Sequence, residues 1–225
     1  MSLAEVAMYA EQIVDDIDLD LGNCPSVRPG GSLLVMVGLP GVGKSSVVEG
    51  LQKLIPVIAI STDGIRTYVR QSPVYTAAEM ALVYEVCYTL IERRLKLGQR
   101  VIFDASNNLQ ARRDYLARLA ARCGAPVTIC SVQAAQDVIQ HRLYQRINGG
   151  RRKTDMSDAD WTVYKWMVET QEPVVEPHLI VDTTSTPPDV LAKRLYHYWL
   201  ESEANAQNNP HLQSPRWANK LSLHN

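Results

Sequence analysis

The sequence predicts an α/β fold in three layers, with a central parallel sheet of about five strands and a helical lid. Three observations carry this prediction. Short apolar runs alternate with longer amphipathic patterns along most of the chain, which is typical of β-strands that are joined by helices. A glycine-rich loop follows the first strong apolar run directly. With 225 residues, the chain is long enough for one sizeable core and too short for two domains of ordinary size.

The first 31 residues are expected to form a helical extension and a linker that precede the main domain. Residues Ala4–Ile17 have their apolar side chains near one face of a helix. Glycine and proline are frequent between Gly22 and Ser32, which is typical of a linker.

Residues 32–200 are predicted to form the main domain, in which strands and helices alternate. The run Ser32–Val37 (SLLVMV) suits a strand that is buried on both faces of a parallel sheet. Thr76 and Glu79 form a capping box at the start of a long helix. Further strands are expected at Val57–Ile60, Val101–Phe103, Val127–Val132 and Leu179–Val181, and further helices at Ser45–Leu54, Gln110–Arg122, Asp137–Arg146, Ser157–Glu169 and Pro188–Leu200. Residues 201–225 are polar and are predicted to be a flexible tail.

Composition excludes several classes of protein. The formal net charge of −1 gives no general attraction to nucleic acid or to anionic membranes, although a local basic groove stays possible. The four cysteines and five histidines do not cluster, so we expect neither disulfides nor a zinc site. The sequence contains no apolar run of about 20 residues and no signal-peptide pattern, so a cytoplasmic protein without membrane contact is expected.

The glycine-rich loop is a phosphate-binding motif. Residues 38–45 (GLPGVGKS) match the pattern G-x-x-x-x-G-K-[ST], between a predicted strand and a predicted helix. Backbone N–H groups of such a P-loop surround phosphate oxygens, its lysine reaches the β- and γ-phosphates, and its serine hydroxyl holds Mg²⁺. We therefore expect ATP and Mg²⁺ to bind at Gly38, Leu39, Pro40, Gly41, Val42, Gly43, Lys44, Ser45 and Ser46, with Lys44 catalytic and Ser45 on the metal. The alternative is a glycine-rich turn without a ligand.

Two absences favour a kinase over other P-loop NTPases. In hydrolytic ATPases a glutamate usually follows the aspartate at the end of an apolar strand, but here Asp104 is followed by Ala105. A GTPase would need an Asn-Lys-x-Asp motif, and the only Asn-Lys pair, at Asn219, continues as Leu-Ser.

Two groups of polar residues follow predicted strands, where ligands of parallel sheets bind. Asp63 stands one helical turn before Arg66, so a carboxylate that orients an acceptor hydroxyl and an arginine can face one cleft. The alternative is a helix cap beside a surface charge. Asp104 is a candidate for the metal or the substrate and Asn107 for the substrate, or else Asp104 caps a helix. The two arginines that follow, Arg112 and Arg113, can equally be surface charges.

A basic segment is the candidate lid. Arg142 and Arg146 share one helical face, and Gly149-Gly150 and Arg151-Arg152 follow. An arginine that lid closure brings to the γ-phosphate stabilises charge in phosphoryl transfer. The alternative is a solvated basic stretch. The aromatic residues Trp161, Tyr164 and Trp166 of the next helix either stack on a substrate or pack in the lid.

These blocks, in this order and spacing, resemble the kinase domain of 5′-hydroxyl polynucleotide kinases. They also resemble the related P-loop kinases of the zeta-toxin-like and gluconate-kinase-like set, and more broadly the AAA-type ATP-binding domains of predicted kinases. The resemblance covers roughly residues 32–200. It implies a P-loop NTPase fold of the nucleoside-monophosphate-kinase type.

The resemblance also implies roles for residues. Asp63 would be the general base and Arg66 would position the acceptor. Asp104 would support the acceptor or the metal. Arg146 would be the catalytic lid arginine, with Arg142 beside it on the nucleotide, and the segment 181–184 would lie near the adenine.

The expected function is therefore ATP-dependent transfer of the γ-phosphate to a hydroxyl group. The acceptor is either a polynucleotide 5′-end or a small metabolite, because related kinases use both. A nucleotide-binding regulatory protein without transfer activity is the alternative. No 3′-phosphatase domain follows the kinase region, and the motif Asp16-x-Asp18-x-Asp20 lacks the preceding strand that a phosphatase nucleophile needs.

Overall fold

The computed structural model describes residues 3–69, 76–148 and 159–207. Its centre is a five-stranded sheet with the order β2-β3-β1-β4-β5, in which all the neighbouring strands are parallel. The strands are β1 (Ser32–Val37), β2 (Ile58–Ser61), β3 (Arg100–Asp104), β4 (Val127–Gln133) and β5 (Leu179–Asp182). This agrees with the predicted parallel sheet of about five strands.

Side chains of β1 alternate between two hydrophobic clusters, one on each face of the sheet. Leu33 and Val35 belong to one cluster, and Leu34 and Met36 belong to the other. All four are almost completely buried. A strand that is apolar on both faces needs helices above and below it, and this requirement produces the three layers.

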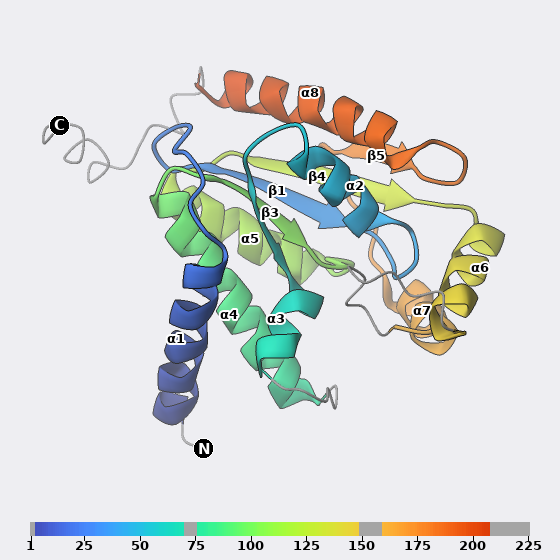
Figure 1. Cartoon of the computed structure of the whole chain (residues 1–225), viewed down its shortest axis with the longest axis horizontal. Helices are drawn as coiled ribbons and strands as arrows, with labels where there is room; N and C mark the ends of the chain where they lie inside the picture. The colour runs from blue at the N-terminus through green and yellow to red at the C-terminus, as the bar shows by residue number, and fades with distance from the viewer. Residues whose placement is uncertain (1–2, 70–75, 149–158, 208–225) are drawn as a thin grey trace, which may run out of the picture.

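Figure 1 shows the helices that cover the two faces. One face carries α2 and α8, which lie side by side and contact each other. The other face carries α4 and α5, with α1 and α3 packed against α4. The bounds of these helices are α1 (Leu3–Asp20), α2 (Lys44–Gln52), α3 (Thr62–Val69), α4 (Ala77–Lys96), α5 (Gln110–Cys123) and α8 (Pro188–Gln207).

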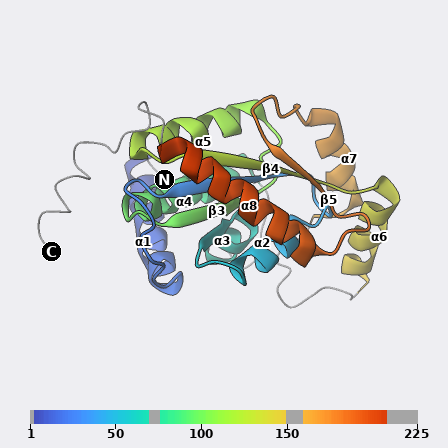
Figure 2. The same cartoon turned by 90° about the horizontal axis from the view of Figure 1, so that it is seen from above.

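Two further helices, α6 (Gln136–Ile147) and α7 (Trp161–Thr170), lie together beyond the carboxyl ends of the strands, as Figure 2 also shows. Helix α7 begins later than the predicted Ser157, because the Asp160 carboxylate accepts hydrogen bonds from the backbone N–H groups of Thr162 and Val163 and caps the helix there. The glycines and arginines at 149–152 lie outside the described residues, as does Ser157.

Helix α1 is part of the folded body and does not stand apart as an extension. Its residues Ala10, Ile13, Val14 and Ile17 are buried in the same cluster as α4. Arg94 of α4 is 3% exposed and donates from Nε to Asp18 Oδ1 at 2.7 Å. The aspartate motif at 16–20 thus has a structural contact.

Helix α8 continues beyond the predicted end at Leu200, so the residues from 201 to 207 are not the flexible tail that the sequence predicted. Glu203 explains the difference, because its two carboxylate oxygens accept hydrogen bonds from Nε and Nη2 of Arg100, both at 2.8 Å. Ala206, one turn later, is 6% exposed. Sheet and helix are therefore joined at this end by a paired charge and apolar contact.

None of the helices in the described ranges combines the length and the apolar character that crossing a bilayer requires. The four cysteines are buried and none forms a disulfide.

Candidate active site

The P-loop lies where the sequence places it, between β1 and α2. Gly41 and Gly43 have φ angles of 80° and 94°, which favour glycine. A Cβ atom on Gly41 would lie 3.0 Å from side-chain atoms of Ile139 and Leu143, and one on Gly43 would lie 3.2 Å from Thr183 Oγ1. Both backbone shape and lack of space therefore require glycine, and the loop can present its N–H groups to an anion.

Lys44 bends back over this loop. Its Nζ donates to the carbonyl oxygens of Gly38 at 2.9 Å and Leu39 at 3.1 Å. These bonds hold the amine on the inner side of the loop, where a phosphate lysine is needed.

Three other predicted residues act electrostatically on the Lys44 amine. Burial lowers the pKa of Lys44, the charges of Asp104 and Asp63 oppose this lowering, and the charge of Arg146 adds to it. Charge interactions fade over about 10 Å. Side chains from the ends of β2 and β3 and from α6 therefore act on the P-loop lysine through their charges.

Ser45 and Asp104 form a pair that suits a divalent cation. The Ser45 hydroxyl donates to Asp104 Oδ2 at 2.7 Å, and Asp104 is 8% exposed. Burial raises the pKa of the Asp104 carboxyl, while the Lys44 charge and the Ser45 hydrogen bond act in the opposite direction. In the described parts of the chain, no group of three or more metal-binding side chains exists. The oxygens of Ser45 and Asp104 could hold Mg²⁺, with phosphate oxygens and water as its other ligands.

Asp63 is held by Arg66. Arg66 Nη1 donates to Asp63 Oδ1 at 2.9 Å, and Arg66 Nε lies 3.9 Å from Glu79 Oε1. The Asp63 side chain is 33% exposed, whereas the whole Arg66 residue is 5% exposed. Arg66, predicted to contact the acceptor, therefore has little surface left for a substrate and is better placed to orient Asp63.

Asn107 does not have the accessible position that a substrate contact needs. It is completely buried, has a φ of 45°, and donates from Nδ2 to the Met36 carbonyl at 2.7 Å. The sequence suggested a substrate residue because asparagine follows the strand end. The structure shows that its amide instead holds the loop after β3 against β1.

The two neighbouring arginines of α5 differ in their surroundings. Arg113 is 2% exposed and donates to the carbonyl oxygens of Asn107 at 3.0 Å and Pro173 at 2.7 Å, so it is not a surface charge. Arg112 is half-buried and lies over the Tyr84 ring, 4.1 Å from the ring centroid. The sequence pattern gave no signal that Tyr84 belongs to this site.

Arg142 connects the P-loop to the segment after β5. Its Nη1 donates to Thr183 Oγ1 at 2.9 Å and to the Gly41 carbonyl at 3.3 Å, and the Thr183 hydroxyl donates to the Val42 carbonyl at 2.6 Å. Thr183 lies in the segment that was expected near the adenine. Arg142 thus braces the P-loop from α6.

Arg146, one turn further along α6, donates from Nη1 to the Ala159 carbonyl at 3.4 Å and acts on Lys44 through its charge. The contact with Ala159 joins α6 to the residues that lead into α7. The predicted lid arginine therefore stands on a helix that contacts the P-loop at Gly41, while Arg151 and Arg152 fall outside the described residues.

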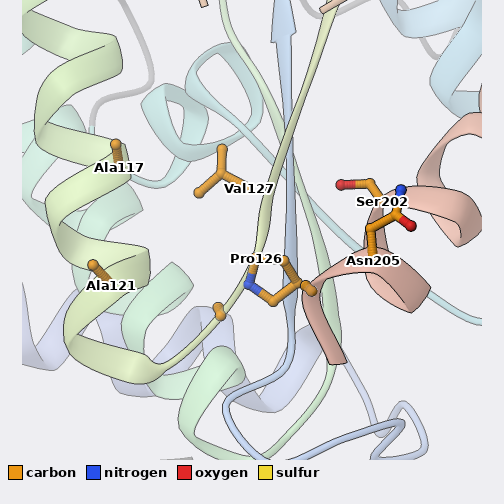
Figure 3. Close-up of a pocket in the computed structure, with 8 residues that line it drawn as sticks. Ala117, Ala121, Pro126, Val127, Ser202 and Asn205 are labelled. Carbon is orange, nitrogen blue, oxygen red and sulfur yellow. The ribbon is translucent and has the colours of Figure 1, made fainter. Parts of the chain in front are cut away.

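A pocket of about 310 Å³ lies elsewhere, and Figure 3 shows residues that line it. It sits between α5 and α8 at the amino end of β4, whereas the P-loop follows the carboxyl end of β1. Its lining is mainly small and apolar: Ala117, Ala121, Ala125, Pro126, Val127, Ser202, Asn205 and Ala206. Because β1 and β4 run in the same direction, this pocket lies at the amino ends of the strands, whereas the candidate site lies at their carboxyl ends.

A family model described as "AAA domain" matches residues 33–173, from β1 to the segment after α7. The match covers more than half of the chain. The chain belongs to the AAA domain family. The matched region of this AAA domain contains the P-loop, Asp63, Asp104 and Arg146, and it begins after α1.

Solved structures similar to this AAA domain are P-loop kinases and related nucleotide-binding proteins. The APS kinase CysC of Mycobacterium tuberculosis, in complex with AMPPNP and APS, is 18% identical with a TM-score of 0.59, over 78% of this chain and 100% of that chain. Kti12 of Chaetomium thermophilum, in complex with ADP-AlF3, is 17% identical with a TM-score of 0.60, over 76% and 98%. These likenesses confirm the predicted P-loop kinase-like fold.

Curated relatives of this AAA domain include the uncharacterised proteins Rv2004c of Mycobacterium tuberculosis and Mb2027c of Mycobacterium bovis. Each is 26% identical over 179 residues, which are 74% of this chain and 34% of the relative. The chain therefore spans about a third of the length of the curated relatives that it matches.

Proposed function

We propose that this AAA domain is an ATP-dependent kinase that transfers the γ-phosphate to a hydroxyl group of an acceptor. One observation carries the proposal: a partly exposed carboxylate, Asp63, is held by Arg66 at 2.9 Å and lies close enough to act on the charge of the P-loop Lys44. Binding of a nucleotide requires only the P-loop. A fixed carboxylate beside it is what a kinase additionally needs for the acceptor hydroxyl.

The P-loop residues 38–46 would bind the phosphates of ATP. Their backbone N–H groups and the start of α2 supply positive potential, and Lys44 contributes a full charge. Ser45 and Asp104 would hold Mg²⁺ through the two oxygens that now share a 2.7 Å hydrogen bond. When bound, Mg²⁺ supplies the charge that neutralises the phosphate oxygens during transfer.

Asp63 would accept the proton of the acceptor hydroxyl. The acceptor oxygen then forms a bond to the γ-phosphorus, the bond from that phosphorus to the bridging oxygen of ATP breaks, and ADP leaves with the electron pair. Arg66 keeps the Asp63 carboxylate in one orientation, which lowers the cost of positioning it. Arg146 would stabilise the charge on the transferring group.

Two similar structures support the proposed kinase function. The APS kinase of Mycobacterium tuberculosis holds AMPPNP together with APS. The shikimate kinase of Acinetobacter baumannii, 14% identical with a TM-score of 0.52 over 77% of this chain and 95% of that chain, is in complex with shikimate. Both are kinases that share this fold and bind a small molecule besides any nucleotide. A polynucleotide 5′-end is the other acceptor that the sequence resemblance suggests.

Transfer from γ-labelled ATP tests the proposal. The acceptors would be a 5′-hydroxyl oligonucleotide and a panel of sugars, nucleosides and alcohols, at two salt concentrations. Contacts with backbone phosphates weaken with salt, so salt-sensitive transfer to the oligonucleotide would identify the nucleic-acid end as the acceptor. Tight Mg·ATP binding without transfer to any acceptor would favour a nucleotide-binding regulatory protein instead.

A further inference from the structure

The arginines around Asp63 differ in how their charge is neutralised. Arg66 is buried between the carboxylates of Asp63 and Glu79. Arg113 is also buried, lies 3.5 Å from a Glu176 carboxylate oxygen, and uses its donors on backbone carbonyls. Arg112 is the exception, since no carboxylate in the described part of the chain lies within ion-pair distance of it.

Arg112 is nevertheless held in place. It extends from the first turn of α5 over the ring of Tyr84 in α4, with its guanidinium carbon 4.1 Å from the ring centroid, and it donates from Nη1 to the Tyr84 hydroxyl. A cation over an aromatic face is fixed in orientation while most of its N–H donors stay available.

Tyr84 places this cation beside the candidate base. Burial raises the pKa of the Tyr84 phenol, the charge of Arg112 lowers it, and the charge of Asp63 raises it. Contacts along α4 agree with this: Arg66, which is bonded to Asp63, also donates from Nη2 to Met80 Sδ at 3.5 Å. Tyr84 follows Met80 by one turn of α4, so the Asp63–Arg66 pair and Tyr84 lie along one face of this helix. The Tyr84 ring also packs edge-on against Phe103 of β3, at 6.3 Å between centroids, so its position is set by the sheet.

The Tyr84 phenol is also linked to the P-loop, through Ser106. The hydrogen bond between the side chains of Ser106 and Tyr84 lowers the pKa of the phenol, and the Ser106 carbonyl accepts from the Gly38 N–H at 3.0 Å. The residues that hold Arg112 therefore adjoin the start of the P-loop.

A half-buried guanidinium that has no carboxylate within ion-pair distance among the described residues gains from a carboxylate or phosphate, because the hydrogen bonds it forms with them are charge-assisted. We infer that the acceptor carries an anionic group, a carboxylate or a phosphate, which Arg112 binds while the hydroxyl is presented to Asp63. This inference rests on the proposed kinase function and names its class of substrate. It moves acceptor recognition from Arg66 to Arg112.

The test determines whether the acceptor is anionic before its identity is known. A deproteinised metabolite extract is divided on an anion-exchange resin into retained and unretained fractions, and wild-type protein is supplied with each fraction and γ-labelled ATP. Label is expected to enter products from the retained fraction. Arg112→Gln is expected to lower the rate of label transfer to this fraction about tenfold or more, because a charge-assisted contact is lost. Arg112→Lys should restore part of the loss.

Arg118→Gln is the matched control, because Arg118 is exposed on the same helix and the charge change is identical. Defined pairs then separate the two sources of charge: glycerate against glycerol, and a nucleoside 3′-monophosphate against the nucleoside. Transfer of label to acceptors of the unretained fraction, or a preference for anions that persists in Arg112→Gln, would overturn the inference. Neither result would contradict the kinase function. Transfer neither to these fractions nor to a 5′-hydroxyl oligonucleotide, with Mg·ATP still bound, would contradict the kinase function and the inference together.

Discussion

The hydroxyl of Ser45 donates a 2.7 Å hydrogen bond to Asp104 Oδ2 and thereby joins the first turn of α2 to the end of β3. The two residues are far apart in sequence, and only the parallel pairing of β1 with β3 brings them together. A metal site at this point depends on the sheet, whereas the phosphate loop depends mainly on its own glycines. The two halves of the nucleotide site can therefore be tested separately.

Lys44→Ala is expected to abolish most transfer while the fold stays intact. Lys44 bonds to the loop carbonyls, and its amine is directed to the loop and not to the core. Thermal melting with and without Mg·ATP measures the effect, since a ligand that binds only the folded state raises the melting temperature. Lys53→Ala is the control, because its amine is exposed at the end of α2. Full ATP-induced stabilisation and full turnover in Lys44→Ala would contradict the assignment.

Asp104→Asn is expected to stabilise the ligand-free protein at neutral pH and to weaken its response to Mg·ATP. Burial raises the pKa of the Asp104 carboxyl, so the folded state binds the proton more tightly than the unfolded chain. The Asp104 carboxyl therefore contributes to the stability of the fold at pH values below its pKa in the unfolded chain. This contribution is lost as pH rises through its pKa in the folded protein.

Melting curves between acid and neutral pH check this sign. The advantage of Asp104→Asn should grow as pH rises and should vanish in acid, where both side chains are neutral. An unchanged Mg·ATP response in this variant would show that the metal lies elsewhere.

Arg146→Ala is expected to slow the chemical step more than it weakens ATP binding. An arginine that acts on the transferring group can contribute on the order of 10³-fold in rate. Single-turnover transfer and equilibrium Mg·ATP binding separate the two effects, with Gln145→Ala, exposed on the same helix, as control. If only the KM for ATP changed, Arg146 would be a simple binding residue.

Glu79→Gln is expected to lower the free energy of unfolding by about 1–3 kcal/mol, because it removes one of two carboxylates from a buried guanidinium. Glu79 is 7% exposed and its Oε1 lies 3.9 Å from Arg66 Nε. Urea unfolding measures the loss. Glu85→Gln, exposed on the same helix, should change stability little. Equal effects of the two substitutions would mean that Glu79 does not stabilise the Arg66 charge.

Local patterns predicted the parts of the molecule that local chemistry determines. The strand at Ser32–Val37 was predicted from a continuous run of apolar residues, and the loop glycines were predicted from the spacing of the P-loop motif. Both signals are contained in short segments of sequence. The Asp63–Arg66 pair was also predicted, since three residues along a helix correspond to almost one turn.

Contacts between distant segments were not predicted. Tyr84 lies 28 positions from Arg112 and Thr183 lies 41 from Arg142, and neither spacing carries a periodic signal. The last turns of α8 were assigned to a tail because Glu203 is polar, yet its partner Arg100 is 103 positions away. Polar residues are placed by the partner that the fold brings to them, so burial of Asn107 and Arg113 could not be inferred from their type.

Label transfer by Asp63→Asn tests the central claim most directly. The substitution keeps the shape of the side chain and removes the charge that accepts the proton. Mg·ATP binding should stay close to that of the wild type, because Lys44, Ser45 and Asp104 are unchanged. Transfer from γ-labelled ATP should fall by about 10²–10⁴-fold, the usual contribution of a general base. Transfer at the wild-type rate by Asp63→Asn would contradict the account.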